Sequence, residues 1–366
     1  MAELRIEQLL REMVNRKASD LHLRVGVPPV YRINGTLQRL FDVRIDSAMM
    51  DSFLDDIMNR DQKQRFEANK ECDFAVGARD MGRFRVNVFR QRGTIAVVIR
   101  HIKAVIPAFE ELHLPEVIRD LALTKRGLVL VTGTTGSGKS TTLASMIDYI
   151  NQKESVNVIT VEDPIEYLYR DNVAIISQRE IGVDTLSYAN ALRAALRQDP
   201  DVLLVGEIRD LETMQIALTA ADTGHMVFAT IHTTNAVETI HRILSMYPPH
   251  QHDEIRLLLA EVLAGIISLR LLPTKDGKGR VPAAEILVNT GAIKEYIQDK
   301  NKIDMVEQAV AEGHIQYHSL TFDQALLELY QNEQISLETA MNAATNRDDF
   351  DLKIRGISGT SDRGWM

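Results

Sequence analysis

The chain has 366 residues, which is enough for two or three domains at roughly 100–200 residues each. Its composition, 45% hydrophobic and 25% charged, is typical of a soluble globular protein and excludes a largely disordered chain. Because 51 acidic residues outnumber 42 basic ones, the net charge of −9 excludes a general attraction to nucleic acid or to an anionic membrane, although a local basic surface remains compatible with it.

The first hundred residues predict an α+β domain. Asn34-Gly35 follows one short alternating run and precedes another, which is a strong signal for a β-hairpin. Farther on, Arg83 and Arg85 alternate with apolar residues, so we expect the two arginines on one face of a strand and the apolar side chains on the other. The expected elements are helices over 9–14 and 47–69 and strands over 21–24, 30–33, 72–76, 82–90 and 94–99.

The pattern changes beyond a boundary between 103 and 114, where Pro107 and Pro115 interrupt it. Short, wholly apolar runs now alternate with helical patterns. This alternation is typical of a parallel α/β sheet whose strands are buried on both faces. The apolar runs lie at 127–131, 156–161, 202–205 and 226–231.

The expected organisation is an N-terminal domain over 1–103, a linker over 104–113 and a second domain over 114–366. Within the second domain, the part from about 257 to 355 is expected to be mainly helical. We expect the tail, 356–366, to be frayed.

Some classes of protein are excluded by what the sequence lacks. Cys72 is the only cysteine, so neither an intramolecular disulfide nor a zinc site with several thiolates can form. The N-terminus has no uninterrupted apolar segment of the kind found in a signal peptide. No stretch reaches the ~18 uncharged apolar residues of a membrane-spanning helix, since the nearest, 257–272, contains Glu261 and Arg270. We therefore expect a cytosolic protein.

A phosphate-binding motif follows the first apolar run. The consensus G-x-x-x-x-G-K-[ST] is matched at every constrained position by Gly133-Thr134-Thr135-Gly136-Ser137-Gly138-Lys139-Ser140, and a helical pattern comes next. The glycines allow backbone N–H groups to curl round a polyanion, and the helix N-terminus favours negative charge. Lys139 would bridge the β- and γ-phosphates, and Ser140 would ligate Mg2+. We predict that this loop, with Thr141 of the following helix, binds ATP.

Polar residues end three of the expected strands, at the edge of a parallel sheet where ligand chemistry gathers. One strand ends in Glu162-Asp163-Pro164-Ile165-Glu166, where the proline cannot extend the sheet. Another ends in Gly206-Glu207, and a carboxylate there can orient and activate an attacking water. A third ends in His232, which could sense the γ-phosphate or polarise water. Each residue alone could be a solvated loop side chain, but three such ends in one sheet favour ATP hydrolysis over binding alone.

Transfer of a phosphoryl group usually needs a cation as well, supplied by the same chain or by a neighbour. No arginine lies next to the phosphate-binding loop in the sequence, and those of the second domain could be ordinary surface or ion-pair residues: Arg193, Arg197 and Arg209. A cluster in the first domain offers a cation that would act across a subunit interface. It comprises Arg83, Arg85, Arg90 and Arg92, for which a solvated strand face is an equally good interpretation.

Together these motifs resemble the secretion ATPase superfamily, and within it the PilT-like type IV pilus retraction ATPases, over nearly the whole chain. The segments 18–22 and 31–35 look like the family's N-terminal PAS-like domain, and 82–87 looks like its arginine strand. The segments 158–166, 205–210 and 223–236 are similar to its Asp box, Walker B region and His box, in the family's order.

The resemblance implies a PAS-like α+β domain joined by a flexible linker to a RecA-like α/β P-loop ATPase domain. It implies a homo-hexameric ring that binds ATP with Mg2+ between the domains and acts through an inner-membrane platform protein on the pilus base. Such a protein would be cytoplasmic and peripherally associated with the inner membrane through the pilus machine. We expect no nucleic acid as a partner, because the acidic chain lacks a basic stripe or a set of stacking aromatic residues.

Position within the motifs implies residue roles. Glu207 would be the catalytic glutamate, and Glu166 an Asp-box carboxylate near the metal. His232 would act at the site as one member of a His-box pair whose other member is His225. The arginine strand would supply Arg83 and Arg85 as contacts in trans, and the remaining Asp-box carboxylates are Glu162 and Asp163.

Two features bear on the branch of the family. Extension and type II secretion ATPases typically carry a longer N-terminal region and a tetracysteine motif, so a chain with one cysteine that starts at the PAS-like domain favours retraction. Retraction ATPases usually carry the motif Ala-Ile-Arg-Asn-Leu-Ile-Arg-Glu, whereas 292–299 here reads Ala-Ile-Lys-Glu-Tyr-Ile-Gln-Asp and lacks both arginines. A plain amphipathic helix that packs Ile293 and Ile297 would explain this segment equally well.

The leading expectation is therefore a motor that retracts pili by depolymerising pilin, as in twitching motility. One alternative is an accessory, PilU-like ATPase or modulator that co-assembles with a paralogous pilus ATPase. A weaker alternative is a pilus extension or type II secretion ATPase.

Overall fold

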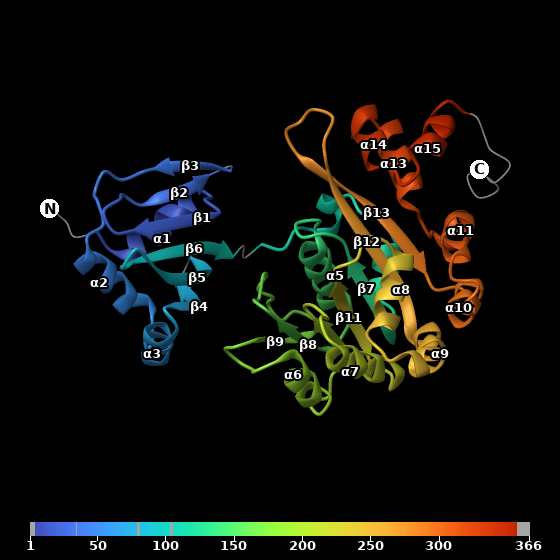
Figure 1. Cartoon of the computed structure of the whole chain (residues 1–366), viewed down its shortest axis with the longest axis horizontal. Helices are drawn as coiled ribbons and strands as arrows, with labels where there is room; N and C mark the ends of the chain where they lie inside the picture. Colours follow the sequence, from blue (N-terminus) through green and yellow to red (C-terminus); the bar gives the residue numbers. More distant parts are fainter. Residues whose placement is uncertain (1–3, 34, 79–80, 103–104, 357–366) are drawn as a thin grey trace. The chain divides into compact units, whose positions relative to one another are not determined.

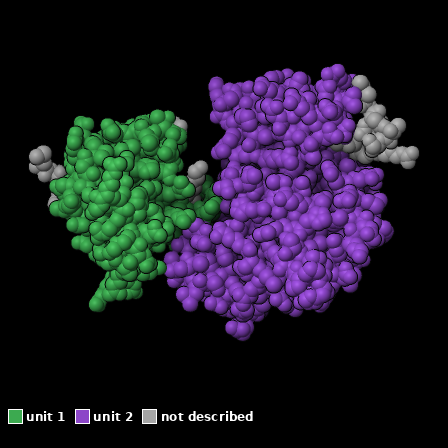
Figure 2. Space-filling view, in the orientation of Figure 1, with its two compact units in different colours: residues 1–105, 166–168 green, residues 106–165, 169–366 purple. Residues whose placement is uncertain are grey.

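The computed structural model describes residues 4–33, 35–78, 81–102 and 105–356. The chain divides into two compact units, coloured separately in Figure 2: residues 1–105 with 166–168, and residues 106–165 with 169–366. Among the described residues, no helix is both long enough and apolar enough to cross a bilayer.

The expected linker covers residues 104–113. In the structure, its residues 106–113 belong to the second unit. Phe109, in the short helix η1 (Phe109–Leu112), is buried in a core of that unit. Ser145 Oγ donates a hydrogen bond of 2.9 Å to the carbonyl of Pro107. The prolines thus mark a packed segment and not a free connection.

The first unit contains an antiparallel six-stranded sheet in the order β3-β2-β1-β6-β5-β4. Its elements are α1 (Ile6–Asn15), β1 (Asp20–Arg24), β2 (Val30–Ile33), β3 (Thr36–Arg39), α2 (Ser47–Ile57), α3 (Arg60–Asn69), β4 (Glu71–Ala78), β5 (Gly82–Gln91) and β6 (Thr94–Ile102). The expected strands are all present, and the hairpin forms between β2 and β3, with its Asn34 outside the described residues. In β5, Phe84 and Val86 are buried while Arg83 and Arg85 face the other way, as the alternation predicts.

The helical block expected over 47–69 is two helices. Met58 is extended, with φ −109° and ψ 131°, so the first helix ends there. Asn59 begins the second helix, because its side chain accepts a hydrogen bond from the backbone N–H of Gln62.

The second unit is built on a seven-stranded sheet in the order β13-β12-β7-β11-β10-β8-β9 (Figure 1). All neighbouring pairs are parallel except β12 and β13. The strands are β7 (Gly127–Thr132), β8 (Asn157–Glu162), β9 (Ile175–Glu180), β10 (Val202–Val205), β11 (Met226–Ile231), β12 (Leu263–Pro273) and β13 (Arg280–Val288). The four strands expected from apolar runs are confirmed as β7, β8, β10 and β11.

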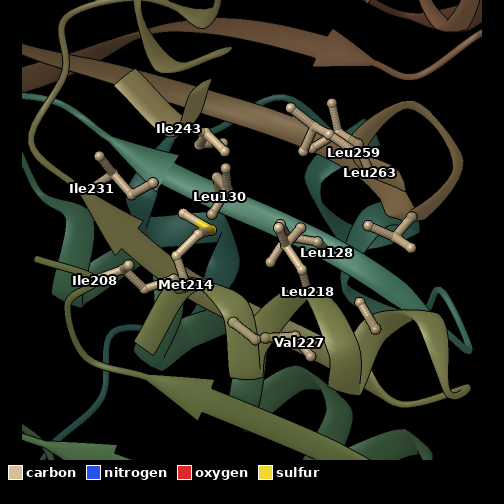
Figure 3. Packing of buried hydrophobic residues seen from close by; sticks show 14 of the residues in the cluster. Leu128, Leu130, Ile208, Met214, Leu218, Val227, Ile231, Ile243, Leu259 and Leu263 are labelled. Carbon is tan, nitrogen blue, oxygen red and sulfur yellow. The ribbon is translucent and has the colours of Figure 1, made fainter. Parts of the chain in front are cut away.

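Helices cover both faces of this sheet. They are α4 (Val117–Ala122), α5 (Lys139–Lys153), α6 (Tyr188–Ala195), α7 (Leu211–Asp222), α8 (Ala236–Ser245), η2 (Pro249–Gln251) and α9 (His252–Val262). Leu128 and Leu130 of β7 pack on the face covered by α7, α8 and α9, as Figure 3 shows. Val129 and Val131 pack on the opposite face, against α4 and α5. A strand with apolar residues on both sides is therefore required here, which explains the wholly apolar runs.

The region beyond 257 corrects the expectation of a mainly helical last third. It first forms the long antiparallel pair β12 and β13, and helices resume only at Gly291. The run Leu263–Pro273 is apolar at nearly every position, so its periodicity does not distinguish a buried strand from a buried helix. The later helices are α10 (Gly291–Gln298), α11 (Met305–Glu312), α12 (His314–Tyr317), α13 (Phe322–Gln331), α14 (Leu337–Ala343) and α15 (Arg347–Ile354). The tail expected to be frayed lies outside the described residues from 357 onward.

Candidate functional site

The phosphate-binding loop connects β7 to α5 in a conformation that glycine makes possible. Gly133 has φ 136°, and a Cβ there would lie 2.5 Å from the carbonyl oxygen of Leu269 and from Ser137 Oγ. Any other residue at this position would overlap the neighbouring strand. The loop is thus pressed against β12, which fixes the start of the motif.

Lys139 and Ser137 give the loop the character of an anion site. Lys139 is 9% exposed, and its Nζ donates hydrogen bonds to the carbonyls of Gly133 (2.9 Å) and Thr134 (3.0 Å). Ser137 Oγ is buried and has no hydrogen-bond partner among the described residues. A buried ammonium and a free hydroxyl, next to the N-terminus of a helix of 15 residues, fit the phosphates of a nucleotide.

Glu207 and His232 come together at the tips of the adjacent strands β10 and β11. Glu207 Oε1 lies 3.1 Å from His232 Nε2, and Glu207 Oε2 accepts a hydrogen bond of 2.6 Å from Arg209. Thr230 of β11 fixes the turn, since its Oγ1 donates to the carbonyl of Gly206 and its own carbonyl accepts from the N–H of Ile208. The two strand tips therefore form one hydrogen-bonded unit.

Electrostatics keep Glu207 ionised. Burial raises its pKa, but the hydrogen bond and charge of Arg209, with the charges of His232 and Lys139, outweigh burial and hold the pKa below its ordinary value. The influence of Lys139 shows that the carboxylate and the phosphate-binding loop share one electrostatic environment. From the sequence, Arg209 could be an ordinary surface or ion-pair residue. In the structure it forms an ion pair with Glu207.

Tyr188 is a residue at this site that the sequence gives no means of finding. A Cβ on Gly206 would lie 3.0 Å from the Tyr188 hydroxyl, so the tyrosine packs against the glycine that precedes Glu207. Burial, together with the charges of Asp163, Glu207 and Glu162, raises the pKa of this hydroxyl far above its ordinary value. Tyr188 thus remains a hydrogen-bond donor among carboxylates.

Two Asp-box carboxylates also lie at this edge of the sheet. Glu162 ends β8, is 7% exposed, and accepts hydrogen bonds from Thr160 Oγ1 (2.6 Å) and Gln178 Nε2 (3.2 Å). Asp163 is exposed directly after it. Glu162 therefore joins β8 to β9, whereas Asp163 is open to solvent.

Four other residues expected at the site are not part of this group at the tips of β8, β10 and β11. Glu166, Arg83 and Arg85 belong to the first unit. His225 precedes β11 at the opposite end of the strand from His232, about 20 Å away at the usual rise per residue, and its Nδ1 lies 2.9 Å from the carbonyl of Ala220. Of the other arginines, Arg193 pairs with Glu212 on the surface, and Arg90 pairs with Glu67 in the first unit.

No group of three or more histidine, cysteine, aspartate or glutamate side chains within the described ranges is arranged to hold a metal ion. The protein is a P-loop ATPase by its fold and by this site.

Comparison with known proteins gives the family. Residues 1–359 match the family described as "Type II/IV secretion system protein". The chain is 41% identical to the type IV pilus ATPase PilU of Pseudomonas aeruginosa over 352 residues, covering 96% of this chain and 92% of the relative. It is also 41% identical to the type IV pilus retraction ATPase PilT of the same organism over 345 residues, covering 94% and 99%.

A solved structure described as the pilus retraction motor PilT with bound ADP is 46% identical, with a TM-score of 0.89, and covers 95% of this chain and 99% of that one. The chain therefore belongs to the type II/IV secretion system protein family, in its PilT/PilU branch of type IV pilus ATPases. The equal identity to PilT and PilU does not separate these two.

Proposed function

We propose that this protein is an ATP-hydrolysing motor that drives type IV pilus retraction. The likeness to a pilus retraction motor over 99% of that chain, with a TM-score of 0.89, is the observation that carries the proposal. The match to a pilus assembly ATPase is less complete, since it covers 51% of this chain and 39% of that relative.

In the proposed reaction, the phosphate-binding loop (133–141) holds the β- and γ-phosphates of ATP. Lys139 would turn from the carbonyls of Gly133 and Thr134 to the phosphate oxygens, and the Ser137 hydroxyl would gain a partner. Ser140 would ligate Mg2+, which when bound neutralises charge on the phosphates. The residues present fit this role because the ammonium and both hydroxyls lie within one turn of the α5 N-terminus.

Glu207 would accept a hydrogen bond from the attacking water and direct it at the γ-phosphate. A pKa held below the ordinary value makes Glu207 a weak base, so its main contribution is to orient the water while remaining ionised. His232 Nε2 lies 3.1 Å from Glu207 Oε1, so it would hold the carboxylate in place and sense the γ-phosphate. Arg209 competes with water for Oε2, and its side chain is 65% exposed and therefore free to move aside.

We further propose that the active form is a homo-hexamer bound to an inner-membrane platform protein, which would place the protein at the cytoplasmic side of that membrane. Arg83, Arg85 and Glu166 would complete the site from the first unit, the arginines reaching across a subunit interface and Glu166 lying near the metal. Arg85 is poised for such a role, since it is 43% exposed and only loosely paired with Asp73 at 3.9 Å.

An accessory, PilU-like role is the second candidate. One observation favours it: the segment 292–299 lacks both arginines of the retraction motif. The identity of 41% to PilU, the same as that to PilT, is compatible with either role. In the structure this segment forms α10, an amphipathic helix that buries Ile293 and Ile297. An accessory protein would work together with a paralogous pilus ATPase.

The experiment is a count of surface pili, with a twitching assay, on host cells that carry Lys139→Ala at the chromosomal locus. Retraction predicts more pili and lost twitching. An unchanged count would support the accessory role, and fewer pili would support extension and reject the proposal. Lys125→Ala, in an exposed pair with Glu154, is the matched control and should behave as wild type.

A further inference from the structure

A row of buried polar side chains crosses three neighbouring strands beside the phosphate-binding loop. Thr132 of β7 lies opposite Ser268 of β12, and Ser268 lies opposite Glu285 of β13. Thr132 and Ser268 are fully buried and Glu285 is 8% exposed. Thr132 Oγ1 donates a hydrogen bond of 2.9 Å to Ser268 Oγ, and Thr132 is the residue directly before Gly133.

The row ends at the first turn of α8. Glu285 Oε1 accepts a hydrogen bond of 2.7 Å from the backbone N–H of Ala236, the first residue of that helix. Ala236 is buried, so this N–H depends on Glu285 for its partner. The carboxylate also interacts favourably with the positive end of the helix dipole.

Stability alone does not account for this carboxylate. Burial raises the pKa of Glu285 to about 7, and the charge of Glu307 adds to the effect. A neutral side chain could accept the same hydrogen bond without the cost of a buried charge.

The first turn of α8 in turn holds the loop that carries His232. Glu238 Oε2 accepts hydrogen bonds from the N–H (2.8 Å) and the hydroxyl (2.5 Å) of Thr234. The hydroxyls of Thr233 and Thr239 lie 2.7 Å apart. The loop between β11 and α8 therefore cannot shift without the start of α8.

We propose that Glu285 is a positioning residue for ATP hydrolysis: it holds the first turn of α8, and with it His232, in register with the strand that carries the phosphate-binding loop. This inference rests on the proposed function, because it takes Glu207 and His232 as the hydrolytic pair. Ser268 and Thr132 complete the connection between the two sides of the site.

The test compares Glu285→Ala with Glu285→Gln in the full-length protein. Alanine removes the acceptor for the Ala236 N–H, and we expect kcat to fall about 10- to 100-fold, as for a misplaced catalytic group, with ADP affinity within about twofold of wild type. Glutamine keeps an acceptor oxygen, so we expect it to restore kcat to within about threefold. Glu285 and Ala236 both line a cavity of about 400 Å3, so water can reach the freed N–H and limit the loss of stability.

Ser319→Ala is the matched control for loss of a buried polar group. Ser319 is fully buried and its Oγ accepts a hydrogen bond from the N–H of Val288 on the strand that carries Glu285. Among the described residues, no side-chain hydrogen bond joins Ser319 to the row. We expect its kcat to be unchanged. If Glu285→Ala does not fold, Ser268→Ala decides: a kcat lowered about threefold or more with ADP affinity retained supports the inference, and an unchanged kcat overturns it.

Two further outcomes would overturn the inference: equal loss of kcat in Glu285→Ala and Glu285→Gln, or a loss in Ser319→Ala as large as that in Glu285→Ala. Glu207→Gln, measured in parallel, separates this failure from failure of the proposed function. If Glu207→Gln keeps its turnover, the proposed hydrolytic pair is wrong. If Glu207→Gln is inactive and the Glu285 variants behave as their control, only the positioning role is wrong.

Discussion

The carboxylate of Glu207 lies 3.1 Å from His232 Nε2, although a helix and a strand separate the two residues in the sequence. Parallel pairing of β10 with β11 brings the two strand ends together, and Thr230 ties one to the other. The chemistry at Glu207 is therefore set by neighbours on two strand tips, with Arg209 on one side and His232 on the other.

Arg209→Ala should raise the pH at which activity is lost on the acid side. In the native protein the pKa of Glu207 lies below its ordinary value, so the ionised form persists until the pH falls through that low value. Without Arg209 the effect of burial is less opposed, so the pKa rises and protonation begins at higher pH. The measurement is kcat as a function of pH for wild type, Arg209→Ala and the control Arg193→Ala, which breaks only an exposed ion pair. If all three proteins lose activity at the same acidic pH, Arg209 does not lower the pKa of Glu207.

Gly133→Ala should destabilise the protein by at least about 2 kcal/mol, from backbone strain and overlap together. The new Cβ would lie 2.5 Å from the carbonyl of Leu269, a backbone atom that cannot swing away. Gly136→Ala is a matched comparison, since Gly136 also has positive φ but open space around it, and should cost about 1 kcal/mol. Denaturant unfolding measures both, and equal costs would show that the loop is not pressed against β12.

Glu285→Gln should stabilise the protein increasingly as the pH rises. With a pKa of about 7 in the folded state, Glu285 binds its proton more tightly than in the unfolded chain, so native stability falls between about pH 4.5 and 7 and stays lower above that range. The full loss is on the order of 3 kcal/mol. Glutamine remains neutral and avoids it.

The measurement is the thermal midpoint of both proteins at pH 5 and pH 8. The charged groups around Glu285 are Arg270 on β12, Glu307 on α11, Glu238 and His241 on α8, and Asp304. They are the same residues in both proteins, so the two proteins differ only at position 285. Glu261→Gln, at an exposed pair with Lys294, is the control. A difference between Glu285→Gln and wild type that is independent of pH would contradict the burial of this charge.

Much of the fold follows from local pattern. The apolar runs predict β7, β8, β10 and β11 because a strand covered on both faces has no polar position to offer. The phosphate-binding loop and Glu207 can also be predicted from the sequence, because each comes just after one of these apolar runs.

The remainder depends on contacts that no local pattern records. β9 alternates exposed and partly buried residues at the edge of the sheet, so it carries little apolar signal, and β12 is apolar at positions that suit a helix equally well. The row from Thr132 to Glu285 appears only when three strands are placed in register, because each of its residues taken alone is an ordinary polar residue near a strand end. Tyr188 packs against Gly206, the residue before Glu207, and only the folded chain brings α6 to this position.

Turnover of the Glu207→Gln protein tests the account most directly. Glutamine keeps the size of the side chain but cannot carry the charge that orients and polarises the attacking water. We predict that ATP and ADP bind as in wild type while kcat falls about 100- to 10,000-fold. Glu212→Gln, at an exposed position on the following helix, should keep its activity. Near-normal hydrolysis by the Glu207→Gln protein would contradict the account, because the site would then have to activate water through another group.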